Sequence, residues 1–157
     1  MRLMPSSEDG LGPLVREWDF VQLTEVLSDY CTFADRRDVE SLCRLFTPEG
    51  SIEVGSHKLE GSAAITAFLR PRFSPDRQTR HLWSNLRIET GAGNELRCAS
   101  TQITFETMAK TGISEIRIGD VSDVFRKLAD GRWRIHRRVV QRAMSMATHS
   151  AGEQKTS

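Results

Sequence analysis

The sequence predicts an α+β protein in which three N-terminal helices pack on a strongly curved, mostly antiparallel sheet. Three observations lead to this prediction. Apolar residues recur at helical spacing in the first part of the chain, long segments rich in β-branched residues fill the second half, and turn sequences separate those segments. Helices followed by a meander of strands are typical of the α+β class.

The first helix is expected over residues 14–34, where the apolar side chains fall near one face. Asp38 is expected to cap a second helix, because its carboxylate can accept a hydrogen bond from a free amide of the first turn. Residues 47–50, Thr-Pro-Glu-Gly, predict a turn. A short hairpin over 51–54 and 57–60 is expected to follow.

Ser62 is expected to cap the third helix, and Pro71 is expected to end it, because proline disfavours helical geometry in the preceding residue. Residues 71–79 are rich in proline and charge, which predicts a loop. Four strands are then expected, over residues 80–89, 96–108, 113–128 and 132–142. The sequence Ala129-Asp130-Gly131 indicates a hairpin turn between the last two.

The length of 157 residues suits one domain. We expect this domain to span residues 14–142. Residues 1–13 and 143–157 are expected to be flexible tails, because they lack apolar periodicity.

The charge balance gives no sign of a nucleic-acid or membrane partner, because 22 basic and 21 acidic residues leave a net charge of only +1. The arginine-rich segment 132–138 is interpreted as a solvated strand face. Neither a signal peptide nor the ~20 apolar residues of a membrane span is recognised. The three cysteines have no C-x-x-C spacing, so reduced thiols and a cytoplasmic location are expected.

No metal or cofactor is predicted. His57, His136 and His149 lack the spacing of metal ligands. The chain also lacks a glycine-rich phosphate loop and a dinucleotide fingerprint.

The segment 80–89 alternates in a way that places His81, Trp83 and Asn85 on one face of its strand. A histidine in such a lined position can act as a base, although a strand histidine can equally be structural. Asp35, at the end of the first helix, can be a helix-terminal or turn residue. Tyr30 lies on the apolar stripe of that helix and can be a core aromatic.

Several segments together resemble the SnoaL-like branch of the NTF2-like proteins, a family of cone-shaped α+β domains with an apolar cavity. The segments are Tyr30 to Asp38, Leu45 to Gly50, Gly61, Arg80 to Asn85, Gly119 to Asp123, Gly131 to Ile135 and Arg138. The resemblance covers roughly residues 14–142 and rests on the order and spacing of these segments.

The catalytic pattern is similar to that of scytalone dehydratase, bile-acid 7α-dehydratase and lindane dehydrochlorinase. This resemblance implies that His81 is a base oriented by Asp35, with Tyr30 as a hydrogen-bond donor. An arginine late in the last strand of the family maps onto Arg138, which could anchor an anionic or carbonyl group or simply pair with Asp123. Trp83, Asn85 and Thr104 are further predicted substrate-binding residues. The strand at 96–108 lacks the second histidine or aspartate of those dehydratases, and Thr104 or Glu106 could replace it.

The predicted function is a cofactor-free lyase or isomerase that acts on a small hydrophobic molecule bearing a carbonyl or hydroxyl group. Two alternatives stay open, because fold does not settle function. One is a non-catalytic ligand-binding or interaction protein, and the other is a structural subunit like the β subunit of ring-hydroxylating dioxygenases. The resemblance also implies a homodimer or homotrimer.

Overall fold

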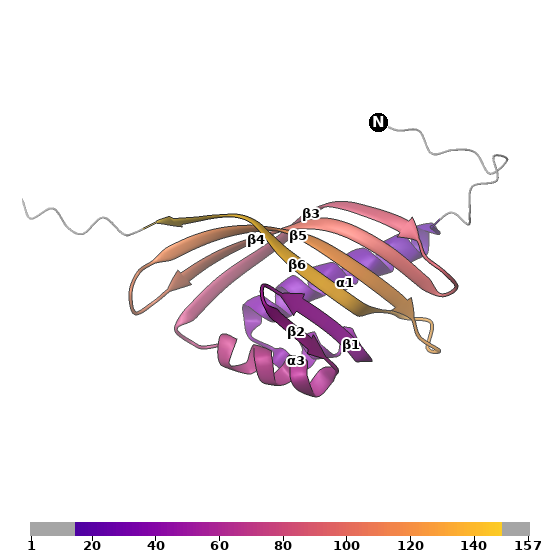
Figure 1. Ribbon diagram of the computed structural model, residues 1–157, viewed down its shortest axis with the longest axis horizontal. Helices are drawn as coiled ribbons and strands as arrows, with labels where there is room; N and C mark the ends of the chain where they lie inside the picture. The colour runs from indigo at the N-terminus through magenta and orange to yellow at the C-terminus, as the bar shows by residue number, and fades with distance from the viewer. Residues whose placement is uncertain (1–14, 149–157) are drawn as a thin grey trace, which may run out of the picture.

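The computed structural model describes residues 15–148 and shows an α+β fold with few helices and one curved six-stranded sheet (Figure 1). The helices are α1 (Glu17–Arg36), α2 (Val39–Cys43) and α3 (Ser62–Leu69), with a 3-10 turn at Arg70–Arg72. The strands are β1 (Phe46–Val54), β2 (His57–Glu60), β3 (Arg77–Thr90), β4 (Glu95–Met108), β5 (Ser114–Lys127) and β6 (Trp133–Thr148). The expected grouping of three helices at the N-terminus needs revision, because α2 has five residues and α3 follows the β1–β2 hairpin.

The sheet has the order β2-β1-β6-β5-β4-β3. All neighbouring strands pair antiparallel except β1 and β6, which run parallel. Helix α1 lies across the concave face and packs mainly against β3, while α3 packs against β1 (Figure 1). The buried core therefore lies between the helices and the concave face of the sheet.

Local signals explain the helix boundaries. Arg37 adopts a left-handed conformation (φ 60°) and ends α1. The Asp38 side chain accepts a hydrogen bond from the Ser41 amide at 2.9 Å, which confirms the predicted cap of α2. Ser62 is the first residue of α3 and does not cap it, because Gly61 occupies the cap position.

The predicted turn at 47–50 is wrong, since these residues belong to β1. The pairing between β1 and β6 is irregular between Phe46 and Ser51. Pro48 lies in this gap, where its missing amide proton removes no ladder hydrogen bond. The predicted loop at 71–79 is shorter than expected, because β3 already begins at Arg77.

The last strand continues to Thr148, six residues beyond its predicted end. Residues 143–148 are therefore strand and not the start of a tail, because they pair with the first residues of β5. The predicted N-terminal tail 1–13 and the remainder of the C-terminal one, 149–157, lie outside the described residues. Within the described part of the chain, no helix is long and apolar enough to cross a membrane.

Candidate active site

The start of helix α1 is fixed to the sheet by a buried aspartate. Asp19 accepts hydrogen bonds from Trp133 Nε1 at 2.8 Å and from Lys127 Nζ at 3.0 Å. The rest of the helix buries an apolar face that includes Leu23, Leu27 and Tyr30. This packing brings the last turn of α1 against strand β3 and sets the position of Asp35.

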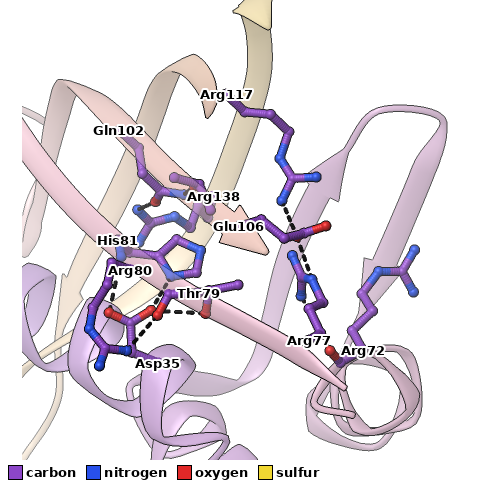
Figure 2. A network of polar contacts seen from close by, with 11 residues as sticks. Asp35, Arg72, Arg77, Thr79, Arg80, His81, Gln102, Glu106, Arg117 and Arg138 are labelled. Atoms are coloured by element: carbon purple, nitrogen blue, oxygen red, sulfur yellow. Dashed lines mark hydrogen bonds and ion pairs between the residues drawn. The ribbon is translucent and has the colours of Figure 1, made fainter. Parts of the chain in front are cut away.

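Asp35 and His81 are joined directly at this contact (Figure 2). The Nδ1 atom of His81 lies 2.6 Å from Asp35 Oδ1, and the backbone N–H of His81 donates to Asp35 Oδ2 at 3.0 Å. Thr79 Oγ1 also donates to Oδ1, at 3.0 Å. Three hydrogen bonds from one strand therefore hold the carboxylate in place.

The contacts of His81 define which ring nitrogen can act as a base. An ionised carboxylate only accepts hydrogen bonds, so Nδ1 carries the proton and Nε2 presents a lone pair. Burial lowers the pKa of His81, and the positive charges of Arg77 and Arg117 lower it further. The hydrogen bond and the negative charge of Asp35 raise this pKa, but the net result lies below the ordinary value of 6.5. The imidazole is therefore neutral, and able to accept a proton, at neutral pH.

His81 lies on the wall of a cavity of about 630 Å³ between the helices and the concave face of the sheet. Tyr30 lines the same cavity, and its hydroxyl has no hydrogen-bond partner among the described residues. Burial raises the pKa of Tyr30, so its hydroxyl stays protonated and can donate. Apolar residues form much of the remaining wall, among them Ile52, Val54, Phe68, Leu69 and Val140.

Thr104 is buried, lines the cavity and lies opposite His81 in the β3–β4 register. Gln102, two residues away on the same face, also lines the cavity and was not among the predicted site residues. Its Oε1 accepts a hydrogen bond from Arg138 Nη2 at 3.2 Å, and its Nε2 lies 3.5 Å from Thr104 Oγ1. The alternation of β4 that points to Thr104 could also have identified Gln102.

Arg138 does not line the cavity, contrary to its predicted role in substrate binding. Its guanidinium is buried over the Tyr30 ring at 3.9 Å, and its Nε lies 3.8 Å from Asp123 Oδ1. Burial raises the pKa of Asp123 to about 6, although Arg138 opposes this rise. Arg138 therefore supports Tyr30 and Gln102 from behind the cavity wall.

Two further predicted residues also lie off the cavity. Trp83 is half-buried against α1 and donates from Nε1 to Ser28 Oγ at 3.2 Å. Asn85 is exposed, because the β3–β4 register shifts between Ser84 and Arg87 and the backbone of Asn85 turns left-handed (φ 56°). Beyond this bulge the alternation reverses, so Leu86 faces the core in place of Arg87.

Glu106, a candidate acid for the leaving group, is paired with Arg77 and Arg117 and does not line the cavity. Burial tends to raise its pKa, but hydrogen bonds from Arg117 and Arg77 lower it below its ordinary value. The carboxylate is therefore ionised.

Among residues 15–148, no cluster of three or more histidine, cysteine, aspartate or glutamate side chains could hold a metal ion. A separate hollow of about 430 Å³ lies on the opposite face of the sheet, around Arg97 and Arg137, away from His81.

Solved structures share this architecture. A candidate scytalone dehydratase from Novosphingobium aromaticivorans superposes with a TM-score of 0.77 at 22% identity, covering 84% of this chain and 89% of that one. A type 2 hexachlorocyclohexane dehydrochlorinase (LinA) gives 0.75 at 13% identity, covering 85% and 90%. ActVI-ORFA from Streptomyces coelicolor gives 0.71 at 20% identity, covering 79% and 96%. At these identities the likeness shows the fold.

The family comparison identifies a family, whereas the structural likeness shows the fold alone. No curated protein sequence matches the chain significantly. A family model described as a SnoaL-like domain matches residues 17–139, which include Asp35, His81 and the whole of the sheet up to the middle of β6. With most of its length matched by that model, the chain belongs to the SnoaL-like domain family.

Proposed function

We propose that the protein is a cofactor-free lyase or isomerase that acts on a small hydrophobic molecule bearing a carbonyl or hydroxyl group. The observation that carries the proposal is the 2.6 Å contact between His81 Nδ1 and Asp35 Oδ1 on the wall of an open cavity. A neutral imidazole held in one tautomer by a carboxylate is suited to general-base catalysis near neutral pH.

The first step is proton abstraction. His81 Nε2 removes a proton from the carbon next to the substrate carbonyl, and Asp35 stabilises the imidazolium that forms. Tyr30 and Gln102 donate hydrogen bonds to the carbonyl oxygen as negative charge develops there. Their donors lie on the same cavity wall as His81.

The second step decides between the two reaction classes. In elimination, the electron pair of the broken C–H bond forms a C=C bond, and the leaving group departs with its own bonding pair. The His81 imidazolium can then return its proton to a departing hydroxide, which leaves as water. In isomerisation the same proton returns to a different carbon. Two structural relatives, a candidate scytalone dehydratase and a dehydrochlorinase, support the elimination class.

The test is an assay of β-hydroxy and β-halo ketones, followed by the absorbance of the enone that elimination produces. We expect turnover by the wild-type protein and its loss in His81→Ala. His136→Gln is the matched control, because His136 contacts Thr47 away from the cavity. Equal activity of His81→Ala and the wild type would contradict the dyad. Binding of the ketones without turnover would favour the non-catalytic ligand-binding alternative.

A further inference from the structure

The cavity has a strongly basic section that the proposed proton transfer does not use. Arg72, Arg77, Arg117 and Arg142 all line it. No aspartate or glutamate belongs to the set of described residues on the cavity wall. This wall combines four guanidinium groups with the apolar residues around Phe68 and Leu69, so its chemistry suits an amphipathic ligand.

Two of the arginines, Arg77 and Arg117, are paired with carboxylates. Arg77 Nε and Arg117 Nη2 both donate to Glu106 Oε2, each at 2.5 Å (Figure 2). Arg117 Nη1 also reaches Glu115 Oε2 at 3.3 Å. Arg77 and Arg117 are thus held in fixed positions, with most of their charge balanced inside the protein.

The other two arginines have no such partner. Arg72 donates to the Phe68 carbonyl at 3.2 Å and stacks over the Phe68 ring at 3.5 Å. Within the described residues, no carboxylate lies within ion-pair distance of Arg72 or Arg142. Positive charge is therefore concentrated at this wall without full compensation.

We infer that Arg72 and Arg142 form a binding site for an anionic group, of the carboxylate class, on the substrate of this cavity. This inference rests on the proposed function only in placing the ligand in the cavity of His81. Guanidinium groups bind carboxylates through paired, charge-assisted hydrogen bonds, and a partly enclosed wall strengthens such contacts. Phe68 fixes the plane of the Arg72 guanidinium and so reduces the entropy lost on binding.

The test compares two ligands of similar shape, the anion 2-naphthoate and the neutral ketone 2-acetylnaphthalene. Binding is followed by NMR on the backbone amides of Thr104 and Gly119, which lie on the cavity wall and so report this site. We expect Arg72→Gln/Arg142→Gln to weaken naphthoate binding by at least about tenfold, the usual effect of losing a charge-assisted hydrogen bond. The affinity for 2-acetylnaphthalene should change less than about twofold, because that ligand carries no charge. Arg132→Gln is the matched control, since Arg132 is exposed in the turn before β6.

Three results would overturn the anion site. They are an unchanged naphthoate affinity in the double variant, an equal loss for both ligands, and no naphthoate binding at millimolar concentration. The two proposals fail separately. Arginine-dependent naphthoate binding with no turnover of any ketone would count against the lyase alone. If the enzyme is active but its naphthoate affinity is the same in the wild type and in the double variant, only the anion site is contradicted.

Discussion

His81 contacts Asp35 with both its ring and its backbone. The ring Nδ1 lies 2.6 Å from Oδ1, and the backbone amide donates to Oδ2 at 3.0 Å. Both carboxylate oxygens are therefore engaged by one residue, and rotation of the carboxyl group would break both contacts. The two carboxylate oxygens of Asp35 thus join helix α1 to strand β3 and also orient the imidazole.

The first prediction concerns Asp35→Asn. The amide nitrogen of asparagine cannot accept a hydrogen bond, so one of the two His81 contacts is lost and the imidazole is no longer held in one tautomer. We expect kcat to fall by about 10²–10⁴-fold, the range for general acid–base groups. The far-ultraviolet circular dichroism should stay that of the folded protein, which serves as the control. A variant with full activity would show that Asp35 is structural.

The second prediction concerns pH. The base is the neutral imidazole, so kcat/KM should rise as His81 loses its proton and level off above its pKa. Because burial lowers that pKa, the midpoint should lie below 6.5 and the plateau should include pH 7. The NMR titration of the His81 ring should give the same midpoint. Asp35→Asn should lower it further, since Asp35 raises the pKa of His81. A midpoint above 6.5 would contradict this account.

Much of this arrangement could be predicted from the chain itself. The Asp38 cap, the alternation that turns His81 and Thr104 inward, and the long antiparallel strands all depend on local patterns. The meeting of Asp35 with His81 was implied by the family resemblance, because no local pattern brings residues 46 positions apart together.

The errors have identifiable physical causes. A single extra residue in β3 reverses the side-chain alternation and moves Asn85 out of the site, and no local sequence signal gave its position. Arg138 was assigned to the cavity by the family resemblance, yet it is buried between Asp123 and Tyr30. Arg142 was missed because the apolar pattern of β6 is weak beyond residue 140, where most side chains are exposed.

The third prediction tests the bulge. Asn85 has φ 56°, a region that asparagine and glycine tolerate better than other residues. Asn85→Ala should lower the free energy of unfolding by about 1–2 kcal/mol, whereas Asn85→Gly should cost less. Urea unfolding measures both, with Ser84→Ala as the neighbouring control. Equal stability of Asn85→Ala and the wild type would indicate that the strain is absent. The KM of either variant should stay unchanged, because Asn85 lies off the cavity.

The fourth prediction concerns the buried ion pair of Asp123 and Arg138, whose side chains are 1% and 2% exposed. Arg138→Met leaves the Asp123 carboxylate buried without a cation, which should cost about 3–5 kcal/mol of stability. Replacing both residues in Asp123→Leu/Arg138→Met should recover much of this loss, because no isolated charge is left behind. Urea unfolding at pH 7 measures the free energy of unfolding of the wild type, of each single variant and of the double variant. Additive losses in the double variant would show that the two residues are not coupled.

The face of the sheet opposite the cavity carries no helix in the described part of the chain (Figure 1). Four large apolar side chains are exposed there: Leu82, Phe105, Met144 and Met146, at 54%, 42%, 62% and 64%. Strand pairing places them close together, since Phe105 and Met146 lie opposite the same residue of β5. Contiguous exposed apolar surface of this kind commonly marks an interface between proteins.

The fifth prediction follows from this surface. We propose that the chain forms a homodimer or homotrimer through it, and light scattering after size-exclusion chromatography should give two or three times the mass of one chain. Leu82→Lys/Met144→Lys should shift the particle to the monomer, because burying two lysine charges in an apolar interface is costly. Glu60→Lys is the control, since this exposed residue lies on β2 at the other edge of the sheet. A wild-type protein that stays monomeric at high micromolar concentration would contradict the assembly. It would leave the His81–Asp35 site unaffected, because both residues lie on the concave side within one chain.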